Sequence, residues 1–274
     1  MFTVEILSGL CNVLKALATA LSIDEHANIL PRLDAHFDAD YREILDDSQI
    51  CHDQSECGLS FVTARWLILA DEHDEQDDLI NDAKVLGDHP NIRNKCLAPL
   101  FSVKTIDWFY DRNLICDRVF NRIITGIERI KFLPVVHNEV ERITQQFSGP
   151  TLAIQIRTWR HKFDNPNIFN LDEGIVRGYN FQTYKSAIDT FLPRAKTIFL
   201  TADNDSVLPE YQEYLKDYNV ITYLQPPNIT QMQYSAATML IASKCNMLVG
   251  SRLSTYAECI WWFGKCRAEV IPVF

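Results

Sequence analysis

Short runs of apolar and β-branched residues alternate with helix-length segments throughout the second half of the chain. The runs that are typical of β-strands lie at 151–156, 197–201, 220–224, 246–250 and 269–274, and the helix-length segments lie at 181–192, 207–218, 229–243 and 255–264. None of the turns between them carries the Asn-Gly pair that is typical of a hairpin. The pattern therefore predicts a parallel sheet covered by helices.

The first half of the chain begins with the same pattern. A predicted strand at 2–7 meets a turn of small residues at 8–12, and a helix with a continuous apolar stripe follows through Leu21. Residues 28–30 predict a second strand, and the segment 107–132 is expected to be mostly helical.

A Gly-Pro break separates the two halves. The predicted helix at 134–147 has a proline at its start and is ended by Gly149 and Pro150. We therefore expect two α/β domains, 1–148 and 149–274, with a cleft between them. Ligands of such sheets bind beyond the carboxyl ends of the strands, so the residues that follow each strand are the candidates for a site.

The composition is that of an ordinary globular protein. Of the 274 residues 47 % are hydrophobic and 23 % charged, which excludes a disordered or fibrous chain and a disulfide-stapled miniprotein. The net charge of −10 argues against a broad electrostatic attachment to nucleic acid or to an anionic membrane. No apolar run approaches the roughly 18 residues of a membrane span, and the first residues lack signal-peptide features. We expect a cytoplasmic protein that binds no nucleic acid.

Eight cysteines are spread along the chain. The nearest pairs, Cys51 with Cys57 and Cys259 with Cys266, do not have the spacing of standard zinc ligands. We expect free, reduced and mostly buried thiols.

Four potentially cationic side chains follow the strand that ends at Ile156, within the six residues 157–162. In a chain with a strong negative charge, such a cluster at the end of a strand indicates an anion site, because a guanidinium offers paired donors to phosphate oxygens. The alternative is a solvated loop whose charges form surface ion pairs.

Two other turns connect a strand to a helix. Ser251, Ser254 and Thr255 follow the strand at 246–250, where a hydroxyl can cap the backbone N–H groups of the next helix. The same geometry binds an anion when the hydroxyls and amides point outward, and both interpretations stay open. Gly9 and Asn12 lie in the first turn of this kind, which lacks the G-x-G-x-x-G pattern of dinucleotide-binding proteins.

Asp203 and Asp205 follow a further predicted strand and form a D-x-D pattern. This pattern could hold a divalent metal that bridges a nucleotide diphosphate. Alternatively, one carboxylate accepts hydrogen bonds from a ribose or base and the other caps the next helix. The acidic run at 71–78 favours a solvated loop over a cation site.

Taken in order, these turns resemble the motifs of the GDP-fucose-dependent fucosyltransferase superfamily, which includes the α1,2-, α1,6- and protein O-fucosyltransferases and the rhizobial nodulation-factor enzyme. Residues 8–17 are similar to its opening G-x-G-N turn, 153–157 to its H-x-R peptide, 201–205 to its second peptide and 250–256 to its third, Ser/Thr-rich peptide. Residues 132–134 resemble the segment between its two halves. The resemblance covers nearly the whole chain.

The resemblance implies a GT-B-like α/β architecture, in which two Rossmann-like domains with parallel sheets face a cleft. The domain 149–274 would bind the nucleotide sugar, and the domain 1–148 would lie on the acceptor side. The implied reaction is an inverting, metal-independent transfer of fucose from GDP-fucose to a glycan or other hydroxyl acceptor, with no cofactor.

The resemblance also implies roles for individual residues. Arg157 would bind the β-phosphate and Asn12 would lie near the donor phosphate and the acceptor, so these two are the candidate catalytic residues. The implied donor-binding residues are Gly9, Gln155, Arg160, Asp203, Ser251, Ser254 and Thr255, with Ser254 and Thr255 on the diphosphate and Asp203 on the nucleoside. Gln155 stands where the family usually has His, Thr158 where a second Arg is common, and Cys11 where Gly is usual.

Such a transfer needs donors that strengthen as negative charge develops on the departing nucleoside diphosphate. It also needs a general base for the acceptor hydroxyl, for which Glu25, His161, Asp172 and Glu173 are candidates. Two alternatives remain open: a metal-dependent transferase of another nucleotide sugar that uses Asp203 and Asp205, and a non-catalytic protein that binds a nucleotide sugar.

Overall fold

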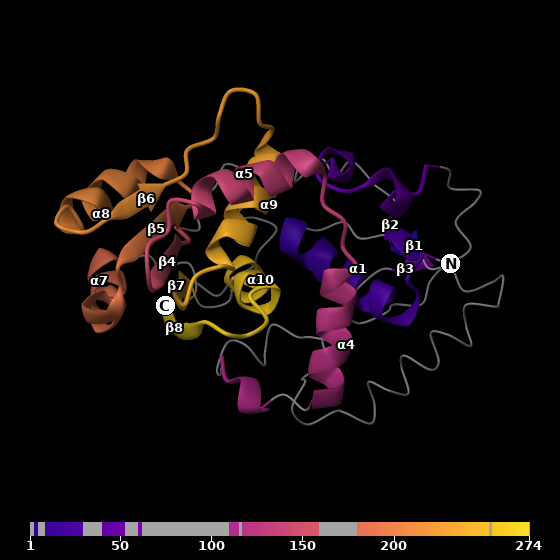
Figure 1. Ribbon diagram of the computed structural model, residues 1–274, viewed down its shortest axis with the longest axis horizontal. Helices are drawn as coiled ribbons and strands as arrows, with labels where there is room; N and C mark the ends of the chain where they lie inside the picture. Colours follow the sequence, from indigo (N-terminus) through magenta and orange to yellow (C-terminus); the bar gives the residue numbers. More distant parts are fainter. Residues whose placement is uncertain are drawn as a thin grey trace, which may run out of the picture. The chain divides into compact units, whose positions relative to one another are not determined.

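The computed structural model describes residues 3–4, 9–29, 40–52, 60–61, 110–114, 117–158, 180–251 and 254–273 (Figure 1). The chain divides into two compact units, Met1–His137 with Thr230–Ala236 and Asn138–Ile229 with Ala237–Phe274. Helices α5 (Pro134–Thr144) and α9 (Gln231–Ala242) each have residues in both units. The domain boundary that we expect between residues 148 and 149 stays a prediction.

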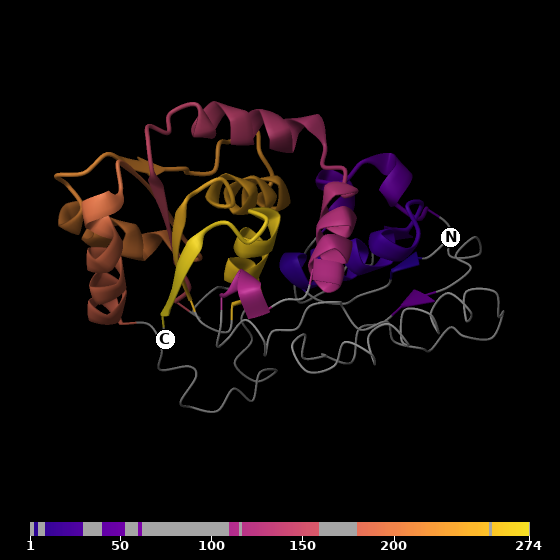
Figure 2. The same ribbon diagram turned by 60° about the horizontal axis from the view of Figure 1, so that its bottom comes forward.

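The second unit contains a sheet of five parallel strands. They are β4 (Thr151–Ile156), β5 (Thr197–Ala202), β6 (Val220–Thr222), β7 (Met247–Ser251) and β8 (Glu269–Val273), in the order β6-β5-β4-β7-β8. Figure 2 shows β7 and β8 side by side, with β8 running to the C-terminus. This confirms the predicted parallel sheet. Pro272 is compatible with it because β8 is an edge strand, where a missing N–H leaves no ladder bond unmade.

The helices of the second unit also follow the predicted segments. They are α7 (Phe181–Phe191), α8 (Leu208–Tyr214) and α10 (Thr255–Phe263), together with the part of α9 that belongs to this unit. The helix predicted at 207–218 is shorter in the structure: α8 covers only Leu208–Tyr214 and directly follows a 3-10 turn, η5 (Asp205–Val207). Pro209 lies in the first turn of α8, where a missing N–H leaves no helix bond unmade, so the main difference is that α8 ends at Tyr214 and not at residue 218.

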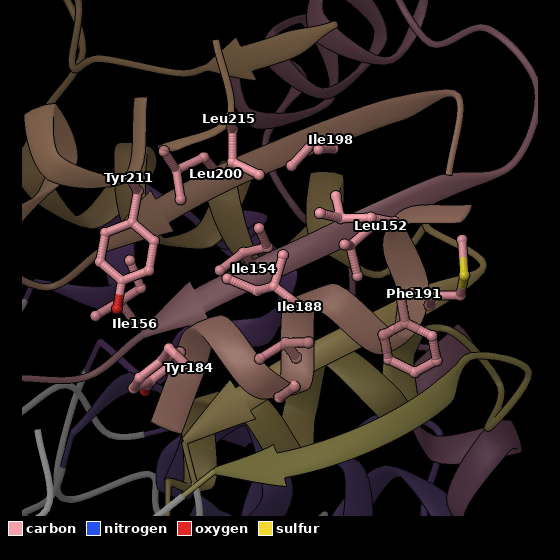
Figure 3. Packing of buried hydrophobic residues seen from close by; sticks show 14 of the residues in the cluster. Leu152, Ile154, Ile156, Tyr184, Ile188, Phe191, Ile198, Leu200, Tyr211 and Leu215 are labelled. Carbon is pink, nitrogen blue, oxygen red and sulfur yellow. The ribbon is translucent and has the colours of Figure 1, made fainter. Parts of the chain in front are cut away.

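Alternating side chains of the sheet pack against different helices. Ile154 and Ile156 of β4 belong to a buried cluster with Tyr184 and Ile188 of α7, and Figure 3 shows these side chains between the strand and the helix. Gly250 of β7 instead faces α10. At Gly250, an added Cβ would lie only 2.9 Å from the Cβ of Ala257, so β7 and α10 approach closely at this point.

The first unit contains a smaller parallel sheet. Its strands β1 (Thr3–Val4), β2 (Asn28–Ile29) and β3 (Ser60–Phe61) lie in the order β2-β1-β3. The other described elements of this unit are α1 (Leu10–Ile23), η1 (Tyr41–Glu43), η2 (Asp47–Gln49), η3 (Arg112–Leu114) and α4 (Asp117–Glu128). The remainder of the strand predicted at 2–7 and the acidic run at 71–78 lie outside the described residues.

Helix α1 is buried more completely than its apolar stripe predicts. Leu14, Leu17 and Leu21 of the stripe are fully buried, and so is Lys15, which is not part of it. Helix α4 packs against α1, and Gly126 of α4 lies against the backbone of Ala18.

The cysteines differ in part from the prediction. Cys11, Cys245, Cys259 and Cys266 are free and buried, as expected. Cys51 is disulfide-bonded, so the prediction of reduced thiols is wrong at this position. A disulfide requires two cysteines close in space, which spacing along the chain does not reveal.

No described helix is long and apolar enough to cross a bilayer.

Candidate functional site

The candidate site lies where the strand order of the five-stranded sheet reverses. The chain runs from β4 through β5 to β6 on one side, and then returns to place β7 and β8 on the other side of β4. Gln155 of β4 is therefore in register with both Thr201 of β5 and Gly250 of β7. Ligands of open parallel sheets bind beyond the carboxyl ends of the strands at this kind of switch point.

An ion pair joins the residues that follow β4 and β5. Nη1 of Arg157 donates to Oδ2 of Asp203 at 3.0 Å, and the two side chains are 22 % and 8 % exposed. The backbone N and Oγ1 of Thr158 both donate to Oδ1 of Asp203, at 2.8 and 2.9 Å. Asp203 therefore fixes both the guanidinium and the backbone of the segment after β4.

The two carboxylates of the D-x-D pattern have different surroundings. Asp203 is held by Arg157 and Thr158, whereas Asp205 is exposed in the turn η5. The residue that caps η5 is Asn204, whose Oδ1 accepts the N–H of Ser206 at 3.0 Å. The alternative interpretation, in which one of the two aspartates is the cap, is therefore wrong in this part. Among the residues that the structure describes, no group of three or more His, Cys, Asp and Glu side chains is arranged to hold a metal ion.

Gln155 connects β4 to the end of β7. Its Oε1 accepts the backbone N–H of Ser251 at 3.3 Å, and both residues are buried. The carbonyl of Ser251 in turn accepts the N–H of Ser254, also at 3.3 Å. The structure thus brings Gln155, Ser251 and Ser254 together, but it gives Gln155 a structural bond where we expected a donor contact, and that contact stays a prediction.

Ser254 is the N-cap of α10. Its Oγ accepts the N–H of Ala257 at 3.4 Å, and its carbonyl accepts the N–H of Glu258 at 3.1 Å. Thr255 is the first helical residue, so its amide precedes the first intrahelical bond of α10. The capping interpretation is confirmed, and anion binding at this helix start stays a prediction.

Tyr184 of α7 was not singled out from the sequence. Its hydroxyl accepts the backbone N–H of Arg157 at 3.2 Å and forms a short hydrogen bond with Oγ of Ser251. The residue is 1 % exposed. Its position on the apolar face of a predicted helix indicates a core residue, and no local signal distinguishes this tyrosine from Tyr211 in the same cluster.

Gly9 and Asn12 belong to the first unit. Gly9 is the N-cap of α1, and its carbonyl accepts the N–H groups of Asn12 and Val13 at 3.0 and 3.3 Å. Glu25 follows the opposite end of α1, about 20 Å from Asn12 at 1.5 Å per helical residue, so these two do not share a site. Arg160, His161, Asp172 and Glu173 lie outside the described residues.

No family model and no curated protein matches the sequence. Solved structures do match the fold. A mutant of Arabidopsis thaliana FUT1 in complex with GDP is 15 % identical with a TM-score of 0.56, over 99 % of this chain and 69 % of that one. NodZ, an α1,6-fucosyltransferase soaked with GDP-fucose, is 14 % identical with a TM-score of 0.56, over 96 % and 92 % of the two chains.

A third match is POFUT1 in complex with GDP-fucose. It is 13 % identical with a TM-score of 0.52, over 99 % of this chain and 97 % of the other. At these identities the likeness shows the fold: the chain has an α/β fold with a five-stranded parallel sheet that is similar to the fold of these fucosyltransferases.

Proposed function

We propose that this protein is a glycosyltransferase that transfers fucose from GDP-fucose to a hydroxyl of a glycan or another acceptor, with inversion and without a metal ion. The observation that carries the proposal is the fold, which is shared over nearly the whole chain with fucosyltransferases whose structures contain GDP or GDP-fucose. The order of the sequence motifs and the polar cluster at the switch point of the sheet support it.

The chemistry assigned to the site follows from the charge that develops during transfer. As the glycosidic bond breaks, the departing diphosphate gains negative charge, and donors that are already in place stabilise it. Arg157 is held by Asp203 through Nη1, and a guanidinium has further N–H donors that can bind phosphate oxygens. The amide of Thr255 and the hydroxyl of Ser254, at the positive end of α10, would supply the other diphosphate contacts.

Asp203 has a positioning role in this proposal. Its two oxygens accept three hydrogen bonds from Arg157 and Thr158, so the carboxylate is already engaged with cationic and hydroxyl donors. This supports Arg157 as the charge that faces the diphosphate, in preference to a metal ion held by Asp203 and Asp205. A contact between Asp203 and the nucleoside would involve the same two carboxylate oxygens. Arg160 would add a second cation next to Arg157.

The remaining proposed contacts are on the acceptor side. Residues 1–148 would hold the acceptor, with Asn12 and the Gly9 turn near the donor phosphate, as the resemblance to the G-x-G-N motif implies. The general base that activates the acceptor hydroxyl would then be His161, Asp172 or Glu173, since Glu25 lies at the far end of α1 from Asn12.

The proposal is tested first with nucleotides. Thermal unfolding of the protein is measured with GDP, GDP-fucose, UDP and UDP-glucose, each with and without excess chelator. A ligand at 100 times its dissociation constant stabilises the folded state by about 2.7 kcal/mol, which is a shift of several degrees. We expect this shift with GDP and GDP-fucose only. In a separate activity assay, we expect excess chelator to cause no loss of GDP-fucose hydrolysis or of fucose transfer.

Other outcomes separate the alternatives. A shift with UDP nucleotides that requires a divalent metal would identify the metal-dependent transferase. Binding of GDP-fucose without any turnover of the donor would identify a non-catalytic binding protein. No shift with any nucleotide would overturn the proposal.

Arg157→Ala tests the assigned catalytic group. We expect at least a 100-fold loss of kcat, of about the size that follows from removing one charge-stabilising donor, with the protein still folded. Arg194→Ala is the matched control, because Arg194 forms an exposed ion pair with Glu269 in the same unit. Near-normal turnover of Arg157→Ala would refute the assignment.

A further inference from the structure

We propose that Tyr184 is a positioning residue, whose hydroxyl sets the spacing between the segment at Arg157 and the turn from Ser251 to Ser254. The inference rests on the proposed function only for its consequence, the affinity for GDP. The positioning itself is a property of the protein without ligand.

Tyr184 contacts both chain segments that carry the proposed diphosphate contacts. Its hydroxyl accepts the N–H of Arg157 at 3.2 Å, immediately after β4. The same oxygen is hydrogen-bonded to Oγ of Ser251 at the end of β7, and Ser251 accepts the N–H of Ser254 through its carbonyl. One phenol group therefore connects two segments that are 94 residues apart in the sequence, the difference between positions 251 and 157.

Ser251 is held from both faces of the sheet. Successive residues of a strand point to opposite faces, so Gln155 and Ile156 of β4 have opposite orientations. Ile156 packs in the cluster that contains Tyr184, while Gln155, on the other face, accepts the backbone N–H of Ser251. With Tyr184 bound to its hydroxyl and Gln155 bound to its amide, Ser251 can move only if one of the two bonds breaks.

The ring of Tyr184 and its hydroxyl have separate roles. The ring is part of the apolar core and makes an edge-on contact with Tyr211, with centroids 6.1 Å apart. Figure 3 shows Tyr184 beside Ile156, at the carboxyl end of β4. A buried phenol hydroxyl usually has hydrogen-bond partners, and here both partners belong to the candidate site. If this position were needed for packing alone, phenylalanine would fill it equally well.

Tyr184→Phe keeps the ring and removes the connection. The first measurement is hydrogen exchange of the backbone amides in the protein without nucleotide. Because the amide of Arg157 loses its acceptor, we expect it to exchange about tenfold faster, together with the amides of Ser251 and Ser254, while those of Leu152–Ile154 are unchanged.

The second measurement is GDP affinity by calorimetry. We expect the dissociation constant of Tyr184→Phe to rise about tenfold, which corresponds to 1.4 kcal/mol. Ser251→Ala should also raise the dissociation constant. The double variant should bind GDP no more weakly than Tyr184→Phe alone, because the bond that Ser251→Ala removes is one of the two that Tyr184→Phe removes.

Tyr214→Phe is the matched control. Tyr214 is the last residue of α8, and its hydroxyl donates to Asp189 of α7, the helix that also carries Tyr184. This hydroxyl bonds neither Arg157 nor Ser251. We expect Tyr214→Phe to have the same amide exchange rates at Arg157, Ser251 and Ser254, and the same GDP affinity, as the unmodified protein. An equal loss of affinity in both variants would overturn the inference, because it would show a general effect on the unit.

The outcomes also separate this inference from the proposed function. If the unmodified protein binds GDP and Tyr184→Phe binds it within twofold of the same affinity, the inference is overturned and the proposed function stands. If the unmodified protein binds no nucleotide, the proposed function fails, and the positioning role of Tyr184 is then judged from the hydrogen-exchange rates alone. Selective acceleration at Arg157, Ser251 and Ser254 then supports the positioning role, and unchanged rates overturn it.

Discussion

Single side chains of this protein acquire their roles from partners that are distant in the sequence. Asp203 is an example: its pattern with Asp205 suggests a metal ligand, but in the fold its oxygens accept hydrogen bonds from Arg157 and Thr158. Thr158 also shows why a departure from a family pattern can be informative. The motif that this part of the sequence resembles commonly has a second arginine here, and in this chain the smaller hydroxyl is buried against Asp203.

The ion pair of Glu139 with Arg142 on α5 permits a prediction about pH. Nη2 of Arg142 lies 2.6 Å from Oε2 of Glu139, whose side chain is 16 % exposed. The hydrogen bond from Arg142 outweighs desolvation and holds the pKa of Glu139 below its ordinary value of 4.5. A carboxyl group with a lowered pKa stabilises the folded state above its unfolded pKa and loses this contribution as the pH falls through the folded value.

We therefore expect Glu139→Gln to lower the free energy of unfolding by about 1 kcal/mol at pH 7 and by much less near pH 3. Urea unfolding at the two pH values measures the difference. Glu213→Gln is the control, because Glu213 and Lys216 form a similar pair that is mostly exposed and is expected to contribute little. An equal effect of Glu139→Gln at both pH values would contradict the pKa shift.

At the scale of helices, the close packing of α1 and α4 depends on one glycine. A Cβ built on Gly126 would lie 1.9 Å from the carbonyl oxygen of Ala18, and the obstacle is backbone that cannot rotate away. A glycine in a helix normally destabilises it by about 1 kcal/mol relative to alanine. Here the close approach of the two helices requires it.

Gly126→Ala should therefore destabilise the protein, by about 2 kcal/mol or more, although it improves the intrinsic helix propensity of α4. Chemical unfolding monitored by circular dichroism measures this. Asn121→Ala, at an exposed position of the same helix, should be neutral or slightly stabilising. A stabilised Gly126→Ala variant would show that α1 and α4 do not pack as the structure describes.

For the whole molecule, the division into units suggests where the unit that contains the five-stranded sheet begins. The compact unit starts at Asn138, within α5, and not at the Gly-Pro break. Residues between these points contact its sheet: the rings of Phe147 and Phe199 have centroids 6.2 Å apart, and the N–H of Ser148 donates to Oγ1 of Thr197 at 3.0 Å.

We predict that a fragment 138–274 melts at a higher temperature, by about 5 °C or more, than a fragment 149–274 that lacks these contacts. Both fragments contain the five-stranded sheet and all of α9, so the difference reports only the eleven residues 138–148. Thermal unfolding followed by circular dichroism is the measurement, with the full chain as reference. Equal melting temperatures would favour the boundary at Gly149 and Pro150.

The periodicity of the sequence was sufficient to predict the strands of the second unit and the type of sheet, but not the length of α8. The strand expected at 151–156 is observed with the same ends, and its neighbours differ by two residues or fewer at each end. These features depend on local patterns of apolar residues and on the absence of hairpin turns. Because parallel strands end at one edge of the sheet, the sequence also indicated which residues gather there, namely Gln155, Arg157, Asp203, Ser251 and Ser254.

Only the tertiary structure decided which of these residues bond to one another. Gln155 and Ser251 are 96 residues apart, and they meet because β4 and β7 are neighbours in the strand order, which no local pattern encodes. The role of the Tyr184 hydroxyl, the burial of Lys15 and the close contact at Gly126 have the same origin. Each depends on how packed elements approach one another, and that distance is determined by the packing of the whole unit rather than by the residues on either side in the chain.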